Sequence, residues 1–334
     1  MVTHALHYQE TDDAYVVGHI HQISPRVEGM VTKVLVKDNQ LVKAGDALVC
    51  IDGQEYEIGL QKARAELAHS QADEAKARAA QEQAKAQLTQ TQTEVQQAES
   101  RVAQAAAQLQ VAKADLGRNA RLYSVDSKAV AKADVDVTKG KYDADEAAMN
   151  GAKANLESAK AAVSVAEAVV DSAGAQLAAA QATVQTNEAA VKDAERLLSY
   201  TTISAPASGR VGNKAVEPGN RVQAGQALMA LAEPDVWVIA NFKETQLTHM
   251  HEGQRVELDI DAFPDHKFSG HLESIAPASG AQFALLPPDN ATGNFTKVVQ
   301  RVPVKVVFDT ESVRGYEDRL RPGLSVVVNV AIRE

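Results

Sequence analysis

Two histidine pairs are the residues whose type and spacing come closest to a chemical site. His19 and His21 are two positions apart, and His249 and His251 repeat that spacing. Side chains two apart on a strand share one face, so a pair could offer two imidazoles to a metal. No clustered carboxylates or cysteines accompany them, and no nucleophile elbow, phosphate loop or zinc-hydrolase motif occurs. We therefore expect surface histidines, no metal, no cofactor and no enzymatic activity.

Other short signals carry little chemistry. Cys50 lies in an apolar run and is expected to be a buried thiol, since one cysteine cannot form a disulfide within the chain. Asn290-Ala-Thr292 and Asn294-Phe-Thr296 match glycosylation sequons, a short and common pattern that matters only in a eukaryotic secretory context. The net charge of −10 argues against a nucleic-acid-binding surface.

The sequence shows no run of 18 apolar residues that could span a membrane and no signal-peptide pattern. Residues 1–13 are polar. These observations leave two alternatives open: a cytosolic protein, or one whose N-terminal membrane anchor precedes the sequence given.

The rest of the chain is organised around residues 54–198, a stretch without proline. All ten prolines lie outside it. Large apolar residues recur every seven positions along two arms, and a small residue follows three positions after nearly every one. On the first arm the large residues are Leu60, Leu67, Leu88, Val95, Val102, Leu109 and Leu116, interrupted at Glu74 and Gln81; on the second they run without a miss from Val135 to Leu198. This pattern predicts the seam of a left-handed coiled coil.

The heptad pattern is lost between about Gly117 and Ala133. A short break between two long helices predicts an antiparallel hairpin with its tip at about 117–133. Each arm has about 65 residues, so the hairpin would be roughly 95 Å long at ~1.5 Å rise per residue. The pattern alone indicates a spacer rod and leaves open what the rod separates.

The segment after the rod repeats the segment before it. When residue n is aligned with residue n+180 from Ile23 to Asp52, ten of thirty pairs are identical without a gap. Glycines match, as in Gly29/Gly209, and each glycine marks a backbone conformation that other residues resist. Because neither half has enough apolar surface for its own core, we expect residues 22–53 and 199–233 to pack as one β-domain.

Residues 234–334 form a third region. Several runs alternate with period two, one short helix is expected at Lys243–Met250, and the strands expected are 236–241, 255–261, 267–275, 300–308 and 324–332. This predicts a small β-barrel, with 14–21 as its first strand. Residues 276–299 form a loop long enough to be functional or disordered.

The repeated halves resemble a known domain. Ile23-Ser-Pro-Arg-Val-Glu-Gly-Met-Val31 and Ile203-Ser-Ala-Pro-Ala-Ser-Gly-Arg-Val211 resemble the two halves of a lipoyl or biotinyl domain. In carrier domains the modified lysine lies in the hairpin joining the halves. Here the rod replaces that hairpin and Asp52–Glu55 supplies no lysine, so the carrier function is not implied.

A lipoyl domain split by a long hairpin resembles the periplasmic adaptors, or membrane fusion proteins, of the HlyD/EmrA kind. The resemblance implies an elongated α+β fold: a coiled-coil hairpin inserted into a split lipoyl-like domain, followed by a small β-barrel. Residues 293–303 resemble the EmrA-type drug-efflux adaptors, which pair with a major-facilitator pump. Candidate pump or substrate contacts are Phe283, Leu285, Leu286, Phe295, Lys297, Gln300 and Arg301. Burial of the apolar ones against the barrel is an equally good interpretation.

The hairpin tip is the other candidate contact. Adaptors that dock onto a TolC-like outer-membrane channel share an arginine, a leucine four residues on, and a serine seven beyond that. Arg118 and Leu122 fit, but the serine position is Ala129, or Ala131 if two extra residues are allowed. The candidate docking residues are Arg118, Leu122, Ser124 and Ser127. The alternative is an ordinary solvated loop.

The resemblance implies a subunit of a tripartite multidrug efflux system, in the periplasm of a Gram-negative bacterium. An N-terminal helix absent from this chain would anchor it to the inner membrane. It would link an inner-membrane drug transporter to an outer-membrane TolC-like channel as a trimer or hexamer, with hydrophobic drugs as candidate ligands. Two alternatives stay open: a type I protein-secretion adaptor working with an ABC transporter, and a rod-like scaffold without an export role.

Overall fold

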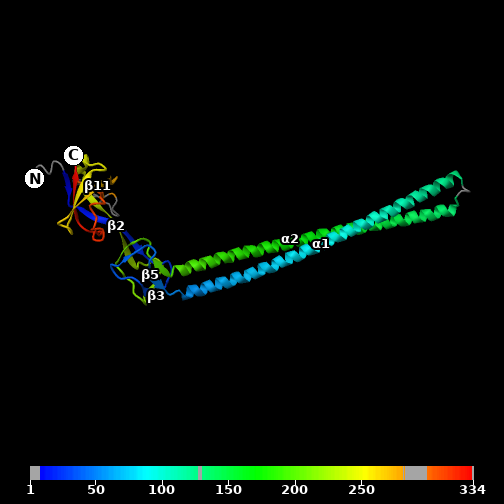
Figure 1. Cartoon of the computed structure of the whole chain (residues 1–334), viewed down its shortest axis with the longest axis horizontal. Helices are drawn as coiled ribbons and strands as arrows, with labels where there is room; N and C mark the ends of the chain where they lie inside the picture. Colours follow the sequence, from blue (N-terminus) through cyan, green and yellow to red (C-terminus); the bar gives the residue numbers. More distant parts are fainter. Residues whose placement is uncertain (1–7, 127–129, 281, 283–298, 333–334) are drawn as a thin grey trace, which may run out of the picture. The chain divides into compact units, whose positions relative to one another are not determined.

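The computed structural model describes residues 8–126, 130–280, 282 and 299–332 (Figure 1). The chain divides into two compact units: Met1–Glu55 together with Arg196–Glu334, and Tyr56–Glu195. The first is built mainly from strands and the second from two long helices. Over the described part of the chain, neither helix contains a stretch apolar enough to cross a bilayer.

The helical unit consists of α1 (Gln54–Val125) and α2 (Lys132–Ser199), which lie alongside one another (Figure 1). Polar contacts fix their register. Arg64 Nη2 lies 2.8 Å from Glu195 Oε1, and Gln181 Nε2 lies 3.4 Å from Glu74 Oε1. Partner numbers on α2 fall as those on α1 rise, so the helices are antiparallel.

The predicted seam of small residues is the contact between the helices. The buried side chains of α1 are Leu60, Ser70, Ala84, Ala98, Ala105 and Ala112. The buried side chains of α2 are Ala166, Ala173 and Val184. All of them fall on the predicted heptad positions. Because most are small, the two backbones can approach closely, as in other coiled-coil seams. The coiled-coil hairpin is therefore confirmed.

The two polar interruptions of the seam are compensated from the opposite helix. The Glu74 carboxylate accepts the Gln181 amide and pairs with Arg78 Nη2 at 2.6 Å. Gln81 lies opposite Gly174, where an added Cβ would be 3.2 Å from Gln81 Nε2. Glu74 on α1 thus faces the amide of Gln181 on α2, and Gln81 faces a glycine.

The helices extend further towards the tip than predicted. The break was expected at about 117–133, but α1 continues to Val125 and α2 begins at Lys132. Asp126 N still donates to Leu122 O at 2.9 Å. The physical reason is that a lost heptad ends the contact between helices, whereas backbone hydrogen bonds continue through residues that favour helix.

The lipoyl-like domain is two-fold symmetric in its hydrogen bonding. Gly29 pairs with Val222, and the equivalent residues Gly209 and Val42 pair with each other. Each short middle strand therefore crosses to the other half, so each half depends on the other for part of its backbone hydrogen bonding. An added Cβ at Gly209 would clash with the Ala232 carbonyl oxygen, so this strand needs glycine. The strands are β3 (Gly29–Val34), β4 (Leu41–Val42), β5 (Ala47–Ile51), β6 (Thr202–Ser204), β7 (Gly209–Gly212), β8 (Arg221–Val222) and the start of β9 (Met229–Lys243).

The barrel shares its two longest strands with this domain. β2 (Ala14–Ile23) pairs antiparallel with β9 along both regions, with a register shift between Gly18 and Ile20. The sheet then continues from β9 through β12, β11 and β10 to β13, and a Tyr15–Ser325 bridge brings β13 back to β2. The remaining elements are η1 (Glu244–His249), β10 (Arg255–Ile260), β11 (Lys267–Ile275), β12 (Arg301–Phe308) and β13 (Val326–Ala331).

One strand was not predicted. Tyr8–Thr11, within the N-terminal segment expected to be only polar, forms β1 and pairs with β13. The segment lacks the alternation that identifies a half-buried strand. The sheet holds it through backbone hydrogen bonds and through the buried Thr11, whose hydroxyl donates to Asn241 O at 2.9 Å.

Candidate functional site

The tip of the hairpin presents apolar side chains to solvent. On α1, Leu122 is 46% exposed and Val125 is 87% exposed; on α2, Val137 is 71% exposed. Arg118 and Leu122 are four residues apart and so share one face of the helix. Uncovered apolar side chains gathered at one end of a structure often mark a contact surface.

The polar residues of the tip bond within their own helix. Arg118 Nη2 lies 3.3 Å from Asp115 Oδ1, and the Ser124 hydroxyl donates to Arg121 O at 2.8 Å. Ser127 and Ala129 lie outside the described residues. Ala131 immediately precedes α2, and its carbonyl accepts the Asp134 N–H at 3.0 Å. It therefore occupies the N-cap position without a side-chain oxygen that could cap the helix.

The outer face of α2 carries no charge over a long distance. It comprises residues 144, 147 and 148 and every seventh residue after each, up to 186, 189 and 190. These three columns of seven positions are adjacent at 3.6 residues per turn. All are exposed, and they hold mainly alanine with Val165 and Val169. We call this surface the uncharged face of α2.

Between residues 143 and 190, the charges of α2 other than Asp145 lie on the flank next to this face. Between residues 143 and 190, eight charged residues lie in the two columns that begin at Asp143 and Glu146, and the ninth, Asp145, lies in the seam. A helix face that only meets water normally carries charges. The segregation therefore marks the uncharged face as a surface suited to packing.

The long-loop candidates are only partly described. Phe283, Leu285, Leu286, Phe295 and Lys297 lie outside the described residues. The backbone carbonyl of Gln300 accepts the Glu244 N–H at 2.9 Å. Arg301 begins β12, and its Nη1 lies 2.8 Å from Asp13 Oδ2. Its guanidinium thus ties the end of the loop to the chain just before β2.

The histidine pairs do not converge on a metal site. The His19 ring packs edge-on against Trp237 with centroids 4.9 Å apart, whereas His21 Nε2 lies 2.7 Å from Glu233 Oε1. Within the described ranges, no three His, Cys, Asp or Glu side chains gather as metal ligands would.

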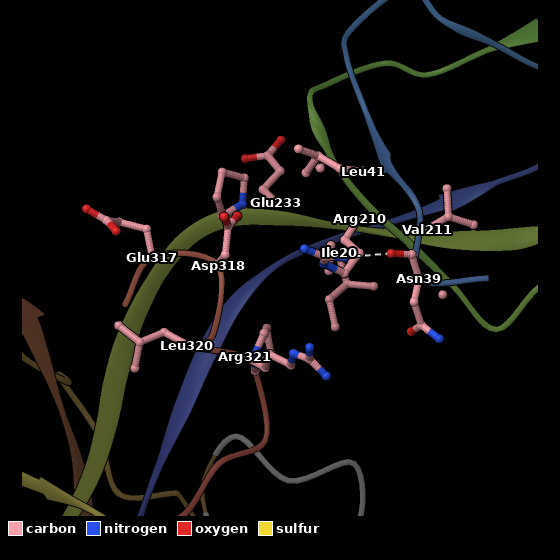
Figure 2. A pocket seen from close by; sticks show the side chains of 15 residues that line it. Ile20, Asn39, Leu41, Arg210, Val211, Glu233, Glu317, Asp318, Leu320 and Arg321 are labelled. Atoms are coloured by element: carbon pink, nitrogen blue, oxygen red, sulfur yellow. Dashed lines mark hydrogen bonds between the residues drawn. The ribbon is translucent and has the colours of Figure 1, made fainter. Parts of the chain in front are cut away.

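A groove that sequence reasoning missed lies where the lipoyl-like domain meets the barrel. Its cavity volume is about 230 Å³. Ile20 and Leu41 contribute apolar surface and are 60% and 59% exposed. Figure 2 shows the charged residues around it: Arg210, Glu233, Glu317, Asp318 and Arg321.

The acidic wall of the groove is a loop held firmly on the barrel. Leu320 is buried in the barrel core, and the Tyr316 ring stacks on His266 at 4.4 Å. Glu317 and Asp318, which lie between these two anchors, instead line the groove. Gly323 N donates to Val16 O at 2.7 Å, which attaches the loop to β2. The carboxylates are therefore carried on a fixed backbone.

A second, polar groove of about 580 Å³ lies beside β6. Arg196 Nη1 lies 3.5 Å from the Tyr200 hydroxyl, and Arg26 Cζ lies 5.0 Å from the centre of that ring. The hydrogen bond from Arg196, followed by that from Arg26, lowers the pKa of the Tyr200 phenol because both favour the phenolate.

Comparison with known proteins identifies the family. The barrel-sandwich hybrid domain of RND membrane fusion proteins matches residues 19–232, and a CusB-like β-barrel domain matches residues 235–282. The first match alone covers more than half of the chain. The chain belongs to the membrane fusion protein family. Members of this family of adaptors are scaffolds rather than enzymes.

Two relatives match this adaptor over almost its whole length. The colistin resistance protein EmrA of Acinetobacter baumannii is 36% identical over 327 residues, which cover 98% of this chain and 87% of the relative. The multidrug export protein EmrA of Escherichia coli K12 is 34% identical over 327 residues, covering 97% and 76%. The predicted resemblance to EmrA-type adaptors is thus confirmed.

A solved structure supports the fold. The structure of the periplasmic adaptor protein EmrA matches with a TM-score of 0.50 and 21% identity, covering 98% of this adaptor and 99% of that chain. The predicted architecture, a helical hairpin inserted into a split lipoyl-like domain and followed by a small β-barrel, is confirmed.

Proposed function

We propose that this chain is the periplasmic adaptor of a tripartite multidrug efflux system. It links an inner-membrane pump of the major-facilitator type to an outer-membrane channel. The observation that carries the proposal is the identity of 34–36% over nearly the whole chain to two proteins named for multidrug export and colistin resistance. The split domain around a long hairpin supports it.

The hairpin provides the length needed to span a gap between two membranes. With 72 residues, α1 is about 110 Å long at ~1.5 Å per residue, a length suited to bridging a gap between two membranes. The role is mechanical, and no bond is made or broken. An N-terminal helix preceding this sequence anchors the protein to the inner membrane of a Gram-negative cell, and the β-unit meets the pump.

The tip meets the channel in this proposal. Leu122 and Val125 offer uncovered apolar contacts, and Arg118, on the same face as Leu122, offers a guanidinium whose ion pair with Asp115 is well exposed. Exposed ion pairs are weak, so Arg118 can exchange Asp115 for a partner's carboxylate or carbonyl. Ser124 and Ser127 complete the docking residues. Ala129, or Ala131 if two extra residues are allowed, stands where adaptors that bind TolC-like channels carry a serine.

The adaptor also assembles with itself, as a trimer or hexamer. The uncharged face of α2 supports this part of the proposal. Two helices stay in contact over many turns only when both follow the same heptad repeat. Another copy of this chain has that repeat, and its α1 carries a matching exposed column of small residues, from Ala65 to Ala114 at every seventh position.

Gene deletion tests the function directly. A strain lacking this adaptor should become more sensitive to hydrophobic drugs or uncouplers, and the full-length gene should restore resistance. A strain that expresses the pump without the adaptor should behave like the deletion. Unchanged sensitivity, with pump and channel both present, would contradict the proposal.

A further inference from the structure

We propose that the groove between the lipoyl-like domain and the barrel binds an amphipathic organic cation. The apolar body of the ligand lies on Ile20 and Leu41, and its cationic group faces Glu317 and Asp318.

The groove carries exposed apolar side chains. Ile20 and Leu41 are among the most exposed large apolar side chains of the β-unit, and both line this one groove. Covering apolar surface removes it from water, which favours the complex. A ligand that covers these side chains therefore gains affinity, and most small-molecule sites are likewise apolar clefts with a few placed polar groups.

The charged side chains of the groove are separated by sign. In Figure 2 the carboxylates of Glu233, Glu317 and Asp318 lie on one side of the groove, and the guanidinium groups of Arg210 and Arg321 lie on the other. The separation leaves one side of the groove negative. A cation placed on that side is attracted without displacing a guanidinium.

The partners of these groups favour a cation over an anion. Arg210 already donates to Asn39 O at 2.6 Å, and the Glu233 carboxylate is 2.7 Å from His21 Nε2. One oxygen of Glu317 accepts the Gly315 N–H at 2.7 Å. Arg210 thus already has a backbone partner, and the Glu317–Asp318 pair lacks a cationic partner among the ion pairs of the described residues.

Gly18 allows the acidic loop to pack closely against β2. A Cβ at Gly18 would lie 3.0 Å from Pro322 Cγ and 3.1 Å from Asp235 O. Glycine therefore allows the acidic loop to lie directly against β2, at the register shift where the lipoyl-like domain passes into the barrel. A ligand here contacts both domains at once and favours one orientation between them.

The test uses two probes of the same size and opposite charge on the purified full chain. Tetraphenylphosphonium should bind saturably with one site, and tetraphenylborate should bind much more weakly. The pair Glu317→Gln/Asp318→Asn should weaken cation binding about tenfold, since each exposed carboxylate contributes about two- to fivefold. Ile20→Ser/Leu41→Ser should weaken it comparably.

The matched control is Glu311→Gln, an exposed carboxylate of the same loop outside the groove; it should leave binding unchanged. Three results overturn the proposal: no saturable cation binding, equal or tighter binding of the anion, or an unchanged affinity in the Glu317/Asp318 variant. Binding to the purified chain is measured independently of efflux, so its failure leaves the adaptor function standing, and the converse also holds.

Discussion

Replacing Gly174 by alanine sets two effects against each other at one position of the hairpin. Glycine inside a helix is less stable than alanine by about 1 kcal/mol. An added Cβ would, however, lie 3.2 Å from Gln81 Nε2 across the seam. The contacted atom is the end of a flexible side chain, which can shift at a cost of about 0.5 kcal/mol. We therefore expect Gly174→Ala to stabilise the hairpin by about 0.5 kcal/mol.

A double-mutant cycle separates the gain in helix propensity at position 174 from the cost of the contact with Gln81. In a Gln81→Ala background the contact is removed, and Gly174→Ala should gain the full ~1 kcal/mol. Gly151→Ala is the matched control, because Gly151 lies within the same helix and an added Cβ there meets nothing within 4 Å. It should gain about 1 kcal/mol in both backgrounds.

Urea unfolding followed by circular dichroism at 222 nm measures these differences, since the helices dominate that signal. If Gly174→Ala and Gly151→Ala were equally stabilising in the parent background, Gln81 would not lie opposite Gly174. If Gly174→Ala were destabilising, the Gln81 side chain could not shift away from the added Cβ at the small cost assumed here. The expected stabilisation would then be wrong.

Three further predictions concern the tip, the uncharged face and the loop anchor. Ala131→Ser should cap α2 and increase amide protection of its first turn by about 1 kcal/mol, measured by hydrogen exchange; unchanged protection would place the N-cap elsewhere. Val165→Lys should dissociate the oligomer in sedimentation experiments, because a lysine buried in the interface lacks a partner there. The control Ser164→Lys, on the charged flank, should leave the oligomer intact. Equal effects of the two substitutions would exclude the uncharged face as the interface. Arg301→Ala should lower the free energy of unfolding by no more than about 1 kcal/mol, because its pair with Asp13 is partly exposed. In an Asp13→Asn background the loss should be smaller, since only the longer hydrogen bond from Arg301 Nη1 to Asn241 O, at 3.4 Å, remains. A double-mutant cycle in urea measures the difference, and an equal loss in both backgrounds would exclude the ion pair.

Elements with a strong period could be predicted from the sequence. The seam follows from the spacing of Leu60, Ala98 and Ala105, because a strict repeat of seven has one structural solution. The paired halves follow from glycines that recur at a fixed interval. Both patterns depend on regular spacing along the chain, so they can be recognised in the sequence alone.

Features that depend on distant contacts could not be predicted. The helix end at Val125 depends on backbone hydrogen bonds that persist after the seam is lost. The strand Tyr8–Thr11 forms because β13 offers an edge. The groove brings Leu41 and Asp318 together from positions far apart in the chain, and no local pattern marks either residue.

In vivo photocrosslinking from the tip tests whether the hairpin reaches an outer-membrane channel. A photoreactive residue replaces Leu122 in the full-length, membrane-anchored protein, and the same residue at the exposed mid-helix position Lys85 serves as control. We expect a crosslink to an outer-membrane channel from position 122 and none from position 85. Crosslinks from position 122 only to the adaptor itself, or to no protein, would contradict the bridging role.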